Sequence, residues 1–319
     1  MESCVSVKLL IVFLLVRFLK VTILQINNIN LIDMDLIYHY TTVDALIGMT
    51  SNMSNTNRNL TMWATDILCM NDPQERKVGV DLMDSFIKEI EKELEIPINC
   101  RISVLKSNQQ YYSSLLNKIP EELSFSDYNA YITSFSKYGD SLPMWSMYAK
   151  NGNGISLGFD RFDREVLGKE HSIRFSYMGE VFYDNLPDEE IKTLLKSFYT
   201  YAYSTLKSFS PLLEKVFNNN NINEMISINS YELYSLIIAS FIKHHSYEYE
   251  GEIRFCSLNN QPMKFRSSNG FIVPYIDYKL PIDYLKLNSS YKCNGIHINN
   301  LFKFFVWCEV SKSFTRSII

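Results

Sequence analysis

The sequence lacks the short motifs that identify the commonest enzyme classes. It contains no G-x-G-x-x-G or G-x-x-x-x-G-K-[ST] phosphate loop, no G-x-S-x-G nucleophile elbow and no H-E-x-x-H zinc motif. Its cysteines show no C-x-x-C spacing and are Cys4, Cys69, Cys100, Cys256, Cys293 and Cys308. This scatter predicts reduced, mostly buried thiols in a cytoplasmic protein rather than a disulfide framework.

Long apolar runs and a strong excess of one charge are also missing. The net charge of -4 exerts no overall attraction on nucleic acid, so we expect no nucleic-acid partner. The longest unbroken apolar run near the N-terminus covers residues 9–16, which is too short to span a hydrocarbon layer of about 30 Å. A membrane span is therefore not expected.

Residues 1–33 allow more than one interpretation. The segment is largely apolar but is interrupted by Lys8, Arg17 and Lys20. One interpretation is that translation starts at Met34 and that the preceding residues are a mis-assigned start. The alternative is a weak membrane or signal segment, although no A-x-A-like cleavage site follows it.

Apolar and aromatic side chains are abundant. With 46% hydrophobic and 21% charged residues, the chain has the composition of a folded globular protein. Its 21 Tyr, 20 Phe and 3 Trp predict a large core and clefts edged by tyrosine. Because there is no internal repeat and no linker rich in Pro, Gly or Ser, residues 34–319 are expected to form one α+β domain.

Hydrophobic periodicity and capping residues predict a central, mostly antiparallel sheet with flanking helices. Strands are expected at 36–40, 60–64, 130–135, 155–159, 252–257 and 271–276, with one or two more within 173–183. Helices are expected at 43–49, 72–94, 102–116 and 144–149, and as an insertion around 189–243 broken near Pro211 and at residues 218–221.

The segment Tyr249–Arg254 combines charges in an unusual way. In an extended conformation Glu250, Glu252 and Arg254 project from one face of a strand. The row is either a salt-bridged ladder at the surface or the polar floor of a cleft. In the second interpretation one carboxylate stabilises an electron-poor transition state and the other positions a nucleophile.

Three further segments offer candidate site residues, each with a structural alternative. His39 ends the first predicted strand, and its imidazole could hold a ribose hydroxyl or only satisfy local hydrogen bonds. Trp145 and Tyr148 share one helical face, where they either pack in the core or stack on a planar ring. Asp72, Pro73 and Glu75 fit a helix cap, which leaves Asn71 to face a ligand.

Metal binding is not expected from the sequence. His244 and His245 lie near Glu248, but adjacent histidines point apart in regular secondary structure. No known spacing of metal ligands accompanies them.

Taken in order, these motifs resemble the bacterial family catalogued as domain of unknown function 2971. The segments that carry the resemblance are 38–41, 71–75, 135–136, 144–148, 154–160 and 249–254, and together they span a family-like core at 36–276. The segment after residue 280 departs from the family pattern. The family implies no established activity.

A looser similarity to ADP-ribosyltransferases implies a mechanism. Those enzymes use an early His, a central aromatic and a late Glu, and this chain has His39, then Tyr148 or Tyr131, then Glu252 in the same order. The similarity implies an NAD-using enzyme of a toxin or phage-defence system, with Glu250, Glu252 and His39 as catalytic residues. The residues expected to bind NAD are Tyr40, Thr41, Ser136, Trp145 and Tyr148, with Asn71 and Arg254 in the same cleft.

The alternative is a non-catalytic module that binds a nucleotide or a partner protein. The enzyme hypothesis requires His39, Tyr148 and Glu252 to surround one cleft. It fails if His39 and Glu252 lie on opposite sides of the sheet.

Overall fold

The computed structural model describes most of the chain between residues 36 and 297. The described ranges are 36–54, 56–70, 75–119, 124, 128–160, 175–208, 210–217, 221–259, 264–268, 270–282, 285–286, 292–293 and 296–297. Met34 and residues 71–74 of the predicted cap lie outside these ranges. Of the segment 281–319, which is expected to depart from the family pattern, only residues 281–282, 285–286, 292–293 and 296–297 are described.

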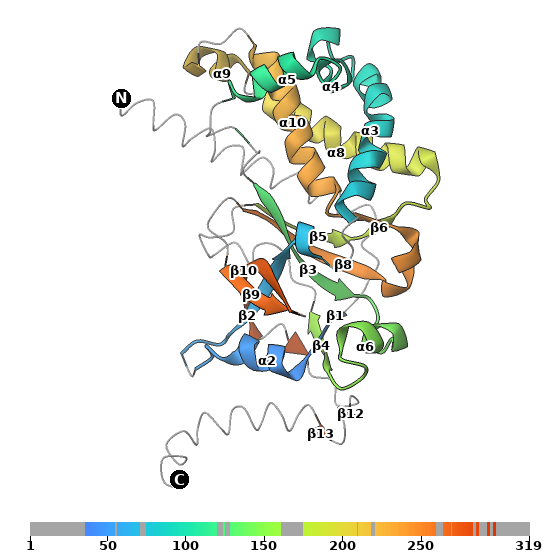
Figure 1. Cartoon of the computed structure of the whole chain (residues 1–319), viewed down its shortest axis with the longest axis vertical. Coiled ribbons are helices and arrows are strands. Elements are labelled where there is room, and N and C mark those ends of the chain that lie inside the picture. Colours follow the sequence, from blue (N-terminus) through green and yellow to red (C-terminus); the bar gives the residue numbers. More distant parts are fainter. Residues whose placement is uncertain are drawn as a thin grey trace.

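The fold is α+β, as the sequence predicts, with one large antiparallel sheet and a layer of helices above it (Figure 1). Its nine strands run in the order β11-β4-β1-β3-β2-β10-β9, and β8 pairs with both β3 and β5. They are β1 (Leu36–Thr41), β2 (Asn59–Asp66), β3 (Asn129–Ser136), β4 (Ile155–Asp160), β5 (Phe175–Glu180), β8 (Glu252–Asn259), β9 (Lys264–Ser268), β10 (Phe271–Pro281) and β11 (Leu285–Lys286). Two short pairs stand apart: β6 (Phe182–Tyr183) runs parallel to β7 (Ile242–Lys243), and β12 (Lys292–Cys293) is antiparallel to β13 (Ile296–His297).

Most helices form one layer at the top of Figure 1. This layer comprises α3 (Glu75–Glu93), η2 (Ile98–Cys100), α4 (Ile102–Leu105), α5 (Gln109–Leu116), α8 (Asp188–Ser208), α9 (Ser210–Phe217) and α10 (Ile222–Ile238), which share one apolar cluster. The remaining helical segments are α2 (Val43–Thr50), η1 (Ile67–Cys69), α6 (Leu142–Tyr148) and η3 (His245–Glu250). The side chain of Thr42 caps α2 by accepting the N–H of Ala45, which confirms the predicted start of that helix.

The two faces of the sheet bury different cores. In β8, Cys256 and Leu258 pack against Leu233 and Leu236 of α10. The alternate residues of β8, Ile253 and Phe255, join a second core with β1, β2, β3, β4 and β10. The first face is called the helix-side face below, and the second the inner face. This division decides which sequence-predicted site residues can meet.

Several expectations about elements need correction. The helix predicted at 102–116 is two helices, because the side chain of Asn108 accepts the N–H of Tyr111 and starts α5 anew. The helical pattern expected up to residue 243 ends with α10, and Ile242–Lys243 is a strand. Strand β9 was not expected from the sequence.

Two further observations concern the cysteines and the helices. Of the cysteines whose side chains are described, Cys100 and Cys256 are buried free thiols, whereas Cys69 is an exposed one. Among the described residues, no helix combines the length and apolar composition that crossing a bilayer would require.

Candidate functional site

A left-handed turn at Gly251 joins η3 to β8 and sets the position of the charged residues. Glu250 ends η3, Gly251 has φ +49°, and Glu252 begins β8. A Cβ at residue 251 would lie 2.5 Å from the ring of Tyr138, so a residue without a side chain is needed. The expectation that Glu250, Glu252 and Arg254 form one extended row is therefore wrong for Glu250, which precedes the strand.

The charged side chains nevertheless meet in one buried network on the helix-side face. Arg254 donates from Nε to Oε1 of Glu252 at 2.8 Å and from a terminal nitrogen to Oε2 at 2.9 Å. Lys243, at the end of β7, donates to Oε2 of Glu250 at 2.7 Å and to Oε2 of Glu252 at 3.1 Å. All four side chains are buried, so two carboxylates face two cations away from water.

Burial and ion pairing act on the two acids differently. For Glu252, burial would raise the pKa, but Arg254 and Lys243 outweigh it and hold the pKa at about 2. For Glu250, burial outweighs the attraction of Lys243 and raises the pKa above its ordinary value. Glu252 is thus a permanent anion at neutral pH, whereas Glu250 has the higher proton affinity.

Aromatic side chains connect this network to α6. The Tyr148 hydroxyl donates to Oε1 of Glu250 at 2.7 Å. Trp145 meets the buried Tyr40 edge-on, with ring centroids 5.2 Å apart, and donates from its indole N–H to Asp140. The hydroxyl of Tyr40 donates to the carbonyl of Tyr138 at 2.8 Å, which holds the loop before α6 against β1.

Most of the predicted site residues are brought together. Ser136 faces Glu252 across the β3–β8 ladder, and its Oγ donates to the Glu250 carbonyl at 2.7 Å. The residues on the helix-side face or next to it are Tyr40, Ser136, Trp145, Tyr148, Glu250, Glu252 and Arg254. Asn71 lies outside the described residues.

His39 and Thr41 are not part of this group. Tyr38 faces Ser136, and Ser136 faces Glu252, so Tyr38 lies on the helix-side face. Because strand residues alternate between faces, His39 and Thr41 lie on the inner face. The ring of His39 accordingly contacts that of Phe135, 5.6 Å between centroids, and its Nδ1 pairs with the Ser134 carbonyl. The single cleft expected around His39, Tyr148 and Glu252 is therefore wrong, and Tyr131 also lies in the inner core.

Lys243 and Tyr183 were missed in the sequence. Lys243 balances both glutamates, and the Tyr183 hydroxyl lies 3.4 Å from the backbone nitrogen of Glu252. Burial raises the pKa of Tyr183 to about 12. The available signal was Lys243 itself, which directly follows residues 236–242, a stretch that is apolar except for Ser240. A lysine that is buried needs an anionic partner.

Comparison with family models matches the part of the chain that builds this network. Residues 144–255 match the model of DUF2971, a protein family of unknown function. The DUF2971 match runs from α6 to β8 and so includes Tyr148, Lys243, Glu250, Glu252 and Arg254. It supports the resemblance read from the sequence and names no activity. Comparison with curated proteins and with solved structures gives no significant match.

Proposed function

We propose that this chain is a non-catalytic binding module that recognises a partner protein through a surface formed by α6 and η3. The observation that carries the proposal is a set of large apolar side chains left in water beside the buried network. The exposed fractions are 81% for Leu142, 52% for Met147, 50% for Tyr138 and 40% for Tyr249. These four residues are called the α6–η3 surface below.

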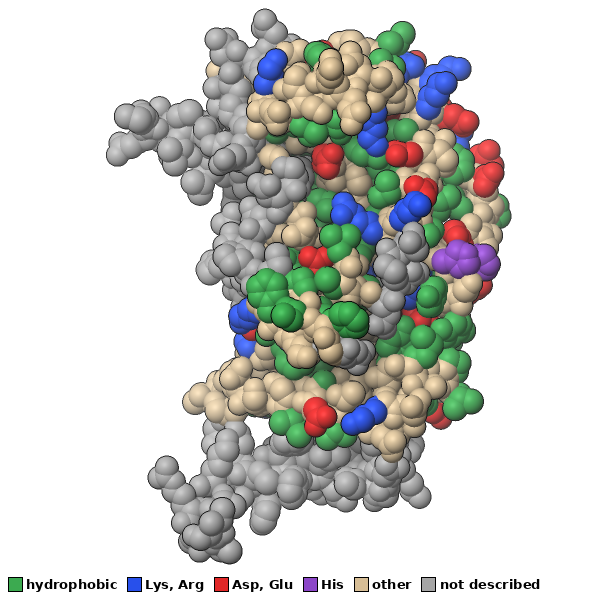
Figure 2. All heavy atoms as spheres, viewed as in Figure 1, with side chains coloured by type: hydrophobic (Ala, Val, Ile, Leu, Met, Phe, Trp, Pro, Cys, Tyr) green, Lys and Arg blue, Asp and Glu red, His purple; other side chains and the backbone are tan. Residues whose placement is uncertain are grey.

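Contacts join Tyr249 to Met147 and place Tyr138 beside the turn that follows Tyr249. The Tyr249 hydroxyl lies 3.1 Å from Sδ of Met147, which joins η3 to α6. The ring of Tyr138 lies against Gly251, two residues after Tyr249. Figure 2 shows hydrophobic side chains gathered over α6, below the histidines in purple. Tyr and Met are enriched in protein interfaces, and grouped exposed apolar side chains mark interaction sites.

The buried network gives this surface a firm base. Tyr148 ties α6 to Glu250, and Lys243 ties Glu250 to Glu252 and hence to the sheet. A surface held in one conformation loses less entropy when a partner binds. In this role the glutamates position α6 and η3 rather than perform chemistry.

An NAD-using enzyme is less well supported by this geometry. His39 and Thr41, which would grip the ribose, lie on the opposite face from Glu252. Glu252 is buried, and its carboxylate already accepts hydrogen bonds from Arg254 and Lys243, so a ribose hydroxyl has little access to it. The use of NAD as a substrate stays a prediction, and the first experiment therefore includes it.

The first experiment tests for turnover of NAD. Purified protein is incubated with NAD, and nicotinamide release is followed beside a Glu252→Gln variant. We expect release at the level of the buffer blank for both proteins. Nicotinamide release by the wild type above the buffer blank would overturn the binding-module proposal in favour of an enzyme, whether or not the destabilised Glu252→Gln variant loses it.

The second experiment tests the surface itself. A photoreactive phenylalanine analogue replaces Tyr249 in cells that make the protein, and Tyr111 of α5, which is 39% exposed, is the matched control position. We expect a discrete protein adduct at 249 but not at 111. Excess wild-type protein should suppress the adduct, whereas a Met147→Glu variant should not. Equal labelling at both positions, or no discrete adduct, would contradict the proposal, and an adduct with a second copy would identify the partner as this chain.

A further inference from the structure

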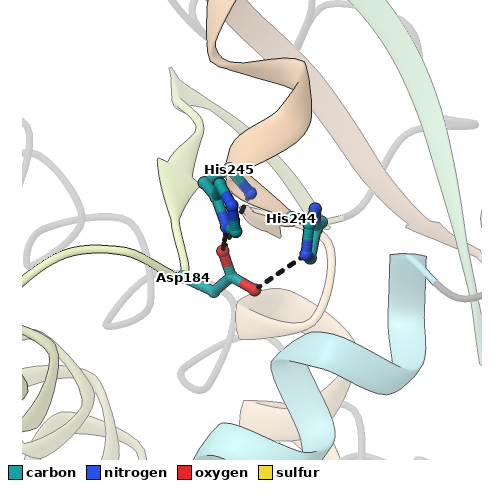
Figure 3. Close-up of side chains that lie close together, drawn as sticks. All are labelled: Asp184, His244 and His245. Carbon is teal, nitrogen blue, oxygen red and sulfur yellow. Dashed lines mark hydrogen bonds and ion pairs between the residues drawn. The ribbon is translucent and has the colours of Figure 1, made fainter.

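A second cluster of polar side chains lies where β6 and β7 end. The two strands are parallel, with Phe182 opposite Ile242 and Tyr183 opposite Lys243. The next residues, Asp184 and His244, therefore leave the strands side by side, and the Asp184 N–H donates to the Lys243 carbonyl at 3.1 Å. In Figure 3 the Asp184 carboxylate directs one oxygen towards the imidazole of His244 and the other towards that of His245.

The two adjacent histidines point towards the same carboxylate. Their ring centroids are 4.2 Å apart and their planes are inclined by 34°. The expectation that they point apart is wrong because they do not lie in one regular element. His244 has the extended angles φ -64° and ψ 138°, and His245 is the first residue of η3.

The spacing of the polar atoms suits a small cation. His245 Nδ1 is hydrogen-bonded to Oδ1 of Asp184 at 2.8 Å, and His244 Nε2 lies 3.9 Å from Oδ2. A metal ion at His245 Nδ1 would replace the proton of that hydrogen bond, which would move to Nε2 of the same ring or to solvent. One ligand atom from each of the three residues can be chosen so that all lie within 4.8 Å of one another. Ligand atoms about 2.0 Å from a tetrahedral metal ion are about 3.3 Å apart, so adjustments of the side chains alone would close the site.

The backbone holds the three residues in place before any ion arrives. The N–H of His245 donates to Oδ1 of Asp184 at 2.8 Å, which adds to the main-chain bond from Asp184 to Lys243. Nδ1 of His244 accepts the N–H of Ser246 at 3.3 Å, a long bond that would be lost if the ring proton moved to Nδ1 and Nε2 bound a metal. Asp184 and His244 are half-buried and His245 is exposed, so an ion can reach them from solvent.

From this geometry we propose that Asp184, His244 and His245 bind one divalent transition-metal ion, with Zn²⁺ as the best fit. Two neutral imidazoles and one carboxylate are typical ligands of such ions. The fourth position would be filled by water or by the exposed Glu248, which lies in the same short helix and contacts Asn185 at 3.4 Å. This reverses the expectation drawn from the sequence, and it does not depend on the proposed partner-binding function.

The test is a titration of the whole chain with Zn²⁺ against a chromophoric chelator, and with Co²⁺ for its visible absorption. We expect one ion per chain, with Co²⁺ bands that lack thiolate-to-metal charge transfer. Asp184→Asn should weaken binding at least about tenfold, and the double variant His244→Ala/His245→Ala should abolish it. Ser246→Ala, which keeps the backbone N–H, is the matched control and should bind as the wild type does.

Urea unfolding distinguishes a variant that folds but no longer binds Zn²⁺ from a variant that no longer folds. Zn²⁺ should shift the wild-type transition to higher urea and leave that of the double variant unchanged. Imidazole NMR resonances of the wild type provide a readout that needs no variant, and two histidines should shift on addition of Zn²⁺. Equal Zn²⁺ affinity in wild type and double variant, a thiolate band with Co²⁺, or no saturable binding would each overturn the proposal.

Discussion

Neutralising Glu252 is the perturbation that best tests whether the charged network is buried. Glu252→Gln keeps the size of the side chain but removes the charge that faces Arg254 and Lys243. The two bonds from Arg254, at 2.8 and 2.9 Å, and the bond from Lys243, at 3.1 Å, all end on this carboxylate. An amide can accept only part of this set, and its NH₂ group then faces a donor.

The expected loss of stability is large. Removing one partner of a buried ion pair typically costs about 3–5 kcal/mol, because the other charge is left uncompensated. The lowered pKa of Glu252 agrees in direction, because the folded state favours the charged carboxylate beside Arg254 and Lys243. Since the pKa is lowered in the folded state, this stabilisation is present above pH 4.5 and is lost as the pH falls towards 2.

Urea unfolding of a double-mutant cycle with Arg254→Met is the appropriate assay. Each single variant should lose about 3–5 kcal/mol, and the double variant should lose about 2 kcal/mol less than their sum. Asp277→Asn is the matched control, because it breaks an ion pair with Lys264 of 2.8 Å at the surface, where the cost is about 0–1 kcal/mol. If Glu252→Gln lowers the free energy of unfolding no more than Asp277→Asn does, the charged side chains are exposed to water and the network is not buried.

Three further predictions concern single residues. Burial lowers the pKa of His39 below 6.5, so the folded state loses stability as the pH falls below that value, by at most about 1.4 kcal/mol per pH unit. His39→Gln should flatten the dependence of unfolding free energy on pH between 7 and about 5, and an unchanged slope would contradict this. Gly251→Ala should lower the free energy of unfolding, measured in urea, by about 1–3 kcal/mol, because φ is +49° and the new Cβ meets the ring of Tyr138. Adding Tyr138→Ala to this variant should recover part of the loss. In the native protein an alkylating reagent should modify Cys69 but spare Cys256, whose pKa burial raises to about 12; peptide mapping before and after unfolding checks the order.

Local sequence patterns predict most elements because they depend on local physics. Alternating apolar residues at 155, 157 and 159 identify β4, and Thr42 marks the start of α2 through a side-chain cap. Where a short-range feature goes unrecognised, the prediction fails, as at Asn108, whose side chain starts a new helix inside an apparently continuous pattern.

The candidate site was predictable only in part. The ordered motifs predicted that Tyr148, Glu250, Glu252 and Arg254 belong to one site, and in the structure hydrogen bonds link the four through Lys243. Lys243 was not among the predicted site residues, because the sequence does not show which acidic side chain a buried lysine will contact. Asp184 was not connected with the two histidines for the same reason, since the pairing of β6 with β7 creates that contact across about 60 residues.

The sequence by itself determined the α+β class, the principal strands and helices, and the presence of a glutamate-rich segment in an aromatic setting. The tertiary structure alone decided on which face each side chain lies. The registers of the β1–β3 and β3–β8 ladders determine which residues of these three strands share a face of the sheet. A shift of one residue in either ladder would have placed His39 on the same face as Glu252. Register is a property of contacts between distant segments, and for that reason it separated two residues whose order along the chain had suggested a common cleft.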